Sequence, residues 1–160
     1  MSAIRNYSNT LIELRSCEQR YRFLREKREV YYVKYLGAKS PVYGKVGGST
    51  NWTPDNMSIF LDLISRKNEK TGMSLDEEME VLSGEMSEYN RLLREMAKSL
   101  KMMRGIEYEL YTEIVINGLT VSNAVKRIAE KNFMSENNVW VQYYPRIKDE
   151  IKKLERNDKV

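Results

Sequence analysis

Residues 128–140 read Ile-Ala-Glu-Lys-Asn-Phe-Met-Ser-Glu-Asn-Asn-Val-Trp, and this stretch decides the fold of the C-terminal part of the chain. Its first apolar and small residues have helical spacing, a short turn is expected at 132–134, and Ser135 is typical of a residue that caps a second helix. Two helices joined by so short a turn, with a polar face at the start of the second, are typical of a helix-turn-helix. The stretch therefore predicts a helical domain that presents one helix to the major groove of DNA.

Further helices are expected on both sides of this turn. Residues 106–116 have apolar side chains on one face and are followed by Asn117-Gly118, a sequence typical of the end of a helix. Thr120 is expected to cap a helix over 121–131. After the turn, the predicted inward stripe consists of Val139, Tyr143, Ile147, Ile151 and Leu154.

Several polar and charged side chains of this region are expected to contact DNA. Amide side chains can bind the edge of adenine and a carboxylate can bind cytosine, while basic side chains and helix N-termini hold the phosphate backbone. The side chains predicted to face outward at the start of the second helix are Glu136, Asn137, Asn138, Trp140 and Val141. The residues predicted to contact the DNA backbone are Lys126, Arg127, Lys131, Ser135, Arg146 and Lys148.

Trp140 and Pro145 qualify this interpretation. Trp140 fits a DNA contact and equally well a core or interface anchor, and any three-helix bundle with a capped second helix has the same pattern. Pro145 removes one helix hydrogen bond and disfavours helical backbone at Tyr144. The recognition helix is therefore expected to be short, with a kink or a restart into 146–155.

The N-terminal part of the chain is expected to form a helical body. A helix is predicted over 7–36, where Gly and Pro are absent, and a Gly-rich loop follows near 37–52. The loop resembles a phosphate-binding loop only faintly, because the order of its residues is wrong. Thr53-Pro54-Asp55 predicts the start of a second helix, which is expected to end near Thr71-Gly72.

Residues 75–103 have the most regular spacing of apolar residues. Ser74 and Glu77 are expected to form a capping box at the start of this segment. The heptad pattern predicts a coiled coil or a long helical hairpin, whose partner is either a second copy of the chain or the helices over 7–36 and 54–71 folding back. The a and d positions are Leu75, Met79, Leu82, Met86, Tyr89, Leu93, Met96, Leu100 and Met103.

Composition narrows the function classes. The 160-residue chain has a net charge of +4, no histidine and one cysteine, Cys17, which argues against histidine-based catalysis, the common zinc sites and an internal disulfide. No apolar run is long enough for a membrane span and no signal-peptide apolar region follows Met1. We therefore expect a soluble cytoplasmic protein that is not an enzyme and carries no cofactor or metal.

The segment Ile128-Ala129-Glu130, followed by Ser135 and Val139, resembles region 4 of sigma factors. Phe133 stands where that family usually has glycine, so the turn is expected to differ or to hold Phe133 without a positive φ. The wider pattern over 107–147 looks like the ArpU branch of phage regulators. The basic first helix, the Gly-rich loop and the helical hairpin resemble the broader ArpU/RinA group.

This resemblance implies a phage or prophage transcription regulator, typically an activator of late genes, that acts with host RNA polymerase in the bacterial cytoplasm. It would read promoter DNA with Glu136, Asn137, Asn138, Val141 and Gln142. A homodimer through residues 75–103 is one of the two arrangements that the heptad pattern allows. We expect an all-α chain in which 1–103 forms the hairpin or coiled-coil region and 104–160 the helix-turn-helix domain. Two alternatives remain: a phage terminase small subunit, which functions in DNA packaging, and a protein-interaction module that does not bind DNA.

Overall fold

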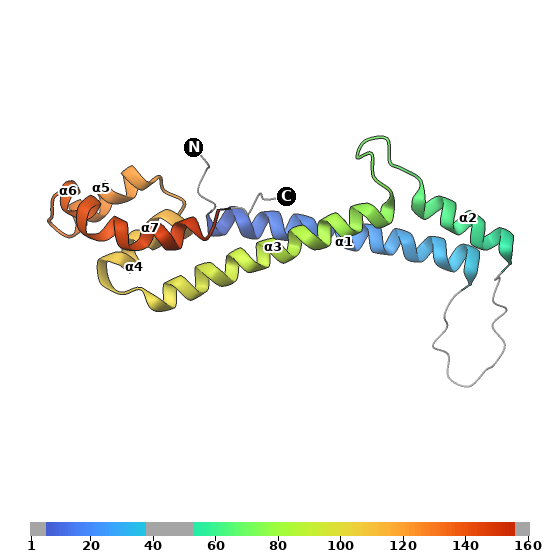
Figure 1. The fold of residues 1–160 in the computed structure, drawn as a ribbon, viewed down its shortest axis with the longest axis horizontal. Helices are drawn as coiled ribbons and strands as arrows, with labels where there is room; N and C mark the ends of the chain where they lie inside the picture. Colours follow the sequence, from blue (N-terminus) through green and yellow to red (C-terminus); the bar gives the residue numbers. More distant parts are fainter. Residues whose placement is uncertain (1–5, 38–52, 156–160) are drawn as a thin grey trace, which may run out of the picture. The chain divides into compact units, whose positions relative to one another are not determined.

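A computed structural model describes residues 6–37 and 53–155, and every regular element in these ranges is helical (Figure 1). The all-α fold class predicted from the sequence is confirmed. None of the described helices combines the length and the apolar composition that crossing a bilayer requires. The Gly-rich loop expected near 37–52 lies, apart from Gly37, outside the described residues.

The chain divides into two compact units. The first unit combines residues 1–15 with 87–160, and the second unit consists of 16–86. Helix α1, Tyr7–Leu36, and helix α3, Leu75–Met102, therefore each contribute to both units. The expected boundary at 103/104 lies inside the first unit, which combines the C-terminal part of α3 with the helices after it.

In the second unit, α1 contacts the N-terminal part of α3 through charged side chains. Arg20 Nε donates to Glu78 Oε1 at 2.8 Å, and Arg28 Nε donates to Asp76 Oδ1 at 3.0 Å. Arg28 interrupts the apolar pattern of α1 because its side chain reaches Asp76 and lies over the Phe60 ring, 5.7 Å from the ring centre. The first helix thus lies against the heptad segment of its own chain, while the homodimer through 75–103 stays a prediction.

Helix α2, Pro54–Ser65, begins as predicted, with the Thr53 hydroxyl oxygen accepting the Asn56 N–H at 3.2 Å. The predicted end near Thr71 is wrong. The backbone becomes extended at Arg66 (φ −66°, ψ 126°), and a separate turn closes where the Asn68 N–H donates to the Met73 carbonyl at 2.9 Å. These local hydrogen bonds replace the helical ones.

A small core in the second unit holds α2 against the end of α1. Its buried members are Leu36, Phe60 and Ile64, and Tyr32 meets the Phe60 ring edge-on at 5.8 Å. Leu61, next to Phe60 on the same helix, is 50% exposed, because it lies outside the narrow contact that a short helix makes with one neighbour.

The start of α3 confirms the capping box: the Ser74 N–H donates to Glu77 Oε2 at 2.9 Å, and the Glu77 N–H donates to Ser74 Oγ at 3.2 Å. None of the predicted a and d residues of α3 is exposed. Leu92 and Ser99 are also buried, although the heptad pattern omits them. In the first unit Ser99 Oγ donates to Glu150 at 2.9 Å, so the segment that contains α7 covers this additional face of α3.

The rest of the first unit consists of short helices, two of which are π-helical. In order these elements are α4 (Gly105–Tyr111), η1 (Thr112–Ile116), α5 (Val121–Lys131), α6 (Glu136–Asn138), η2 (Val139–Tyr143) and α7 (Tyr144–Lys152). In η1 and η2 the backbone bonds span five residues instead of four, as in the bond from the Asn117 N–H to the Thr112 carbonyl. Pro145 has no N–H to donate to the Val141 carbonyl, and the helical turn before it is the wider, π-helical η2. A kink or a restart of the helix was predicted at this point.

The predicted inward stripe after the turn forms part of the core of this unit. Val139, Ile147, Ile151 and Leu154 are buried, and Tyr143 is half-buried. From α4, η1 and α5 the core receives Leu110, Tyr111, Ile114, Val115, Ala124, Val125, Ile128 and Ala129.

Candidate nucleic-acid interface

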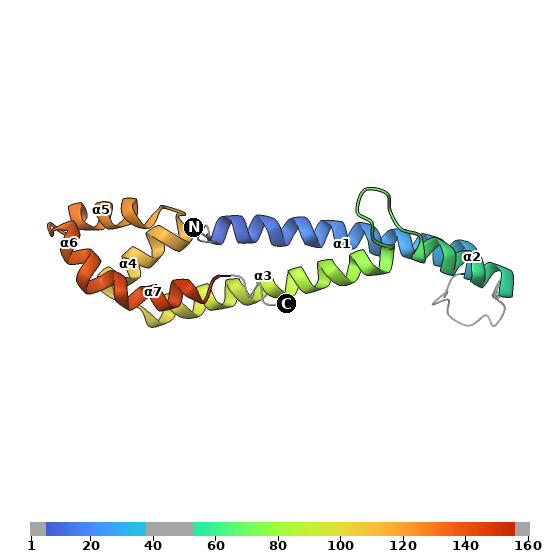
Figure 2. The same cartoon turned by 45° about the horizontal axis from the view of Figure 1, so that its top comes forward.

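Two capped helix starts position the candidate site. The Thr120 hydroxyl oxygen accepts the Asn123 N–H at 3.3 Å at the start of α5. Ser135 Oγ accepts the Asn138 N–H at 3.2 Å at the start of α6. Both predicted caps are therefore confirmed, and α6 lies where the chain turns from α5 into α7 (Figure 2).

Small and apolar residues hold α5 against the segment that follows the turn. Ala129 is 2% exposed and Val139 is fully buried, so nothing larger than a methyl group stands at position 129 in this part of the core. The close approach fixes the direction of α6, because an extra side-chain atom at this position would separate the two segments.

The turn between α5 and α6 ends α5 with a Schellman motif. The Met134 N–H donates to the Ala129 carbonyl at 3.0 Å, and the Phe133 N–H donates to the Glu130 carbonyl at 3.4 Å. This pair of bonds requires a left-handed residue at position 133, and Phe133 adopts φ 53°. The expectation that the turn avoids a positive φ at Phe133 is wrong, because the hydrogen-bonded end of α5 determines the backbone there.

Phe133 is the one non-glycine residue with positive φ in the described part of the chain, and its side chain is 98% exposed. A left-handed non-glycine residue costs roughly 1–2 kcal/mol. The end of α5 explains the conformation of Phe133, but the phenyl ring gains nothing from packing inside the chain, so folding does not explain its exposure. Both features instead place an apolar side chain on the surface beside α6.

The predicted base-reading side chains lie mostly on the surface. Glu136, Asn137, Val141 and Gln142 are exposed, whereas Asn138 is half-buried behind the cap. The side chains of Glu136, Asn137 and Gln142 make no hydrogen bond or ion pair with any described residue. Their donors and acceptors are therefore available to a ligand.

Trp140 is neither a core residue nor a free surface residue. Its ring meets the Tyr144 ring edge-on, with 5.0 Å between the ring centres, and 37% of the residue is exposed. One part of the indole thus packs against the next helical turn and another part faces solvent. This placement suits a side chain that is fixed in orientation before it contacts a partner.

Three of the predicted backbone-contact cations are paired with glutamates of α4 and η1. Their nitrogen–oxygen distances are 3.3 Å for Arg127–Glu113, 3.2 Å for Lys131–Glu109 and 2.9 Å for Arg146–Glu107. The side chains of the three cations remain 63–66% exposed, whereas those of the glutamates are only 17–33% exposed. The carboxylates therefore lie beneath the cations and hold them at the surface.

Exposed pairs of this kind contribute about 0–1 kcal/mol, so a phosphate can replace the glutamate at small cost. The hydrogen bond to Glu107 raises the pKa of Arg146, which keeps this guanidinium charged. Lys126 and Lys148 are exposed and have no ion pair with the described residues. The Ser135 hydroxyl is already used as the cap of α6.

The glutamate partners of these cations were not predicted from the sequence. Glu109 and Glu113 are four residues apart, as are Arg127 and Lys131, and the pairs run in opposite order along α5 and the α4–η1 segment. Two neighbouring antiparallel helices with matched i, i+4 charges would have indicated this ladder.

A buried polar cluster lies in the core of the same unit. Tyr111 is fully buried and its hydroxyl has no hydrogen-bond partner in the described part of the chain. Burial raises the pKa of Tyr111 to about 12, partly offset by the nearby Ser99 hydroxyl. Ser99 donates to Glu150 instead, and the pKa of Glu150 is lowered chiefly by its hydrogen bond from Lys153.

The described side chains contain no group of three or more His, Cys, Asp or Glu placed to hold a metal ion. Comparison of the chain with protein-family profiles, with curated proteins and with solved structures finds no match. The site is therefore interpreted from its own geometry.

Proposed function

We propose that the chain is a sequence-specific DNA-binding transcription regulator that reads base edges with α6 and η2. The observation that supports this most directly is the start of α6, where Glu136 and Asn137 stand exposed and without partners just after the Ser135 cap. Polar side chains at the start of an exposed helix are the groups that a recognition helix inserts into the major groove. Lys126 and Lys148 supply positive charge on neighbouring helices.

The finer architecture belongs to the same proposal. In it, α5, the turn and α6 form a sigma region 4-like helix-turn-helix, and the long helices form the body that carries it. The resemblance to the ArpU/RinA group supports a phage or prophage late-gene activator in a bacterial host, with promoter DNA and host RNA polymerase as partners. A homodimer through 75–103 completes this proposal.

A protein-interaction module is the second candidate, and one observation favours it. Phe133 and Val141 expose apolar side chains, 98% and 64%, next to a partly exposed Trp140. Exposed aromatic and branched residues close together in sequence are typical of protein contacts.

Selection of binding sequences from random duplex DNA by the full chain tests the proposal. The selected duplex should bind Asn137→Ala more weakly than the wild type by about 1–3 kcal/mol, the usual contribution of one bidentate base contact. Asn138→Ala should have a smaller effect, because Asn138 is half-buried. Gln19→Ala removes an exposed amide from α1 and serves as the matched control.

Failure to enrich any sequence, or equal effects of Asn137→Ala and Gln19→Ala, would contradict base reading by α6. Salt dependence then distinguishes the two candidates. The logarithm of a DNA-binding constant falls with the logarithm of the salt concentration by about 0.9 per phosphate contacted. Two contacts, from Lys126 and Lys148, predict a slope near −1.8, and the additional release of Arg127, Lys131 and Arg146 predicts about −4.5.

A further inference from the structure

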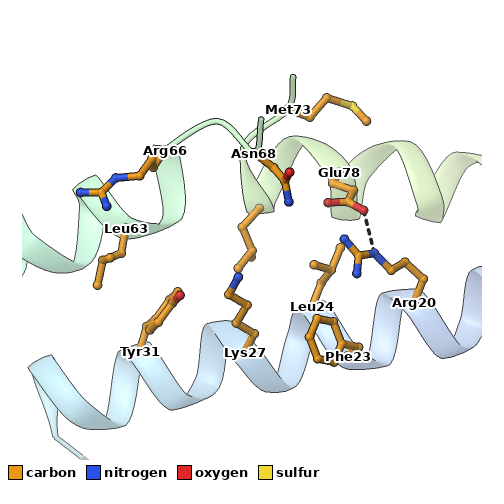
Figure 3. A pocket seen from close by; sticks show the side chains of 11 residues that line it. Arg20, Phe23, Leu24, Lys27, Tyr31, Leu63, Arg66, Asn68, Met73 and Glu78 are labelled. Atoms are coloured by element: carbon orange, nitrogen blue, oxygen red, sulfur yellow. Dashed lines mark hydrogen bonds and ion pairs between the residues drawn. The ribbon is translucent and has the colours of Figure 1, made fainter. Parts of the chain in front are cut away.

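The second unit contains a small cavity between α1 and the connection from α2 to α3 (Figure 3). Its volume is about 130 Å³. Arg20 and Glu78 lie at one end, Arg66 at the other, and Lys27 extends from α1 toward the space between them (Figure 3). All of these residues belong to 16–86, so the cavity is independent of the proposed DNA site.

Several side chains that line the cavity carry hydrogen-bond donors without a partner in the described part of the chain. Arg20 donates to Glu78 through Nε alone, which leaves both terminal nitrogens without a partner among the described residues. Arg66 donates through one terminal nitrogen to Asp62 at 2.7 Å. The ammonium of Lys27 has no carboxylate partner in the described ranges and lies 5.9 Å from the centre of the Tyr31 ring.

Asn68 adds a neutral donor to this set. Its side-chain oxygen accepts the Lys70 N–H at 2.8 Å, which fixes the amide within the turn and leaves the Asn68 NH₂ group without a partner in the described chain. By contrast, Glu78 is the one carboxylate lining the cavity, and Arg20 already neutralises it. Three cations and one carboxylate give the lining a net charge of +2.

Two amides at the start of α3 already have partners. The capping box uses the Ser74 and Glu77 amides, and the side chain of Glu77 completes it. The positive charge of the cavity therefore comes from Arg20 and Lys27 of α1 and from Arg66 at the end of α2.

Size limits the ligand. At about 30 Å³ per water, the cavity holds about four waters, or one oxyanion with little room to spare. Sites for drug-sized molecules and cofactors are larger, about 300–1,000 Å³. A phosphate group carries about −1.5 to −2 charges at pH 7 and has several acceptor oxygens for donors that approach from different directions. A carboxylate has one charge and fewer acceptor positions.

We infer that this cavity binds a phosphate group, either free phosphate or the end of a phosphorylated side chain, through Arg20, Lys27, Arg66 and Asn68. Phosphate binding would join the end of α2, the connection to α3 and α1, because each supplies a donor. The second unit would then be stabilised by its anion as well as by its small core.

Titration of the full chain with inorganic phosphate, followed by backbone-amide NMR, tests the inference. Saturable shifts are expected at the amides of 66–73 and near Lys27. Lys27→Gln should weaken binding by about tenfold or more, because it removes a charged donor. Lys34→Gln is the matched control: Lys34 lies one heptad further along α1, over the Tyr35 ring at 5.3 Å, and is not part of the cavity lining.

Absence of saturation by phosphate, an equal response to chloride, or equal weakening by Lys27→Gln and Lys34→Gln would overturn the inference. Arg66→Gln is a second test variant. It should also weaken phosphate binding, and it leaves the side chains of α1 unchanged. A parallel titration with O-phosphoserine separates the two sources: tighter binding than phosphate indicates a phosphorylated side chain, and weaker binding indicates the free anion.

Discussion

Glu78 in the second unit and Tyr111 in the first are both buried polar side chains, but they differ in their hydrogen bonding. Glu78 accepts a hydrogen bond from Arg20, whereas the Tyr111 hydroxyl has no partner in the described part of the chain. The first unit also contains the left-handed Phe133 and both π-helical segments, while 16–37 and 53–86 contain neither feature.

The energetically unfavourable local features of the described chain thus lie in the first unit. Strained backbone, π-helical segments and unpartnered buried groups occur more often at functional sites than elsewhere. Of these features of the first unit, the left-handed Phe133 and the π-helical η2 flank the exposed start of α6, which supports a binding surface there. In the second unit, the Arg20–Glu78 and Arg28–Asp76 pairs hold α1 against α3.

Alkaline pH should expose the contrast between Tyr111 and Glu78 most strongly. The folded chain keeps the Tyr111 proton up to about pH 12, and the unfolded chain releases it near pH 10. The titration of Tyr111 therefore does not change the free energy of unfolding below pH 10. Between pH 10 and pH 12 it lowers the free energy of unfolding by about 2 kcal/mol, because only the unfolded chain has lost the proton. Urea denaturation at several pH values should show a decrease that is smaller by about 2 kcal/mol in Tyr111→Phe than in the wild type, because Lys153, whose pKa is also raised, contributes to both.

Tyr108→Phe, which removes an exposed hydroxyl from the same helix, should keep the wild-type decrease. At neutral pH, Tyr111→Phe should also stabilise the chain by about 1 kcal/mol, because it removes a buried hydroxyl without a partner. A loss of stability at neutral pH would show that the hydroxyl has a favourable interaction.

Replacement of Arg20, the partner of Glu78, should have the next largest effect on the free energy of unfolding. Arg20→Met leaves a carboxylate that is only 10% exposed without its cation, and should lower the free energy of unfolding by about 1–2 kcal/mol. Arg66→Met breaks a pair whose carboxylate, Asp62, is 65% exposed, and should change it by less than about 0.5 kcal/mol. Equal effects in urea denaturation would mean that burial of Glu78 does not matter.

Relief of strain at Phe133 should raise stability modestly. Phe133→Gly removes the left-handed penalty but makes the unfolded chain more flexible, so a net gain of about 0.5–1 kcal/mol is expected. Phe133→Ala removes the ring and keeps the strained backbone, so it should give no gain. Thermal unfolding compares the two, and similar values would place the cost in the exposed ring instead of the backbone.

The smallest effect on stability is expected for the glutamates that pair with Arg127, Lys131 and Arg146 of the proposed DNA site. Glu113→Gln should change the free energy of unfolding by less than about 0.5 kcal/mol, since Arg127 is mostly exposed. If the DNA-binding proposal is right, the freed Arg127 should increase affinity for the selected duplex about twofold to fivefold. Glu130→Gln removes the same charge from exposed α5, and an equal increase there would indicate a general charge effect.

Much of the local structure could be predicted from short patterns. The caps at Thr53, Thr120 and Ser135 and the capping box at Ser74 all form, because each depends on a side chain and an amide a few residues apart. The heptad stripe of α3 is likewise inward throughout, since a helix determines its own faces.

Features that depend on tertiary contacts or on competing hydrogen bonds could not be predicted in this way. The early end of α2 results from the turn that Asn68 and Met73 close. Of the candidate site, the exposure of Glu136 and Asn137 follows from the cap, but the partners of Arg127 and Lys131 lie on a helix that is distant in sequence. The positive φ of Phe133 was not predicted, because residues other than glycine rarely adopt it. The two hydrogen bonds that end α5 require it nevertheless.

The π-helical segment η2 determines the phase of the C-terminal helix. In a continuous α-helix, at about 100° per residue, Ile147 would point about 80° away from Val139, yet both are buried. The wider turn of η2 compensates for this angle. Removal of one residue from Val139–Tyr143 would leave a seven-residue spacing, which a regular α-helix places about 20° apart, so Ile147 should stay in the core without the widened turn. Removal of one residue after η2 would instead turn Ile151 and Leu154 by about 100° and out of the core. The side chains that would face DNA and those that anchor α7 thus lie on one continuous backbone whose two faces are set in register by a single widened turn.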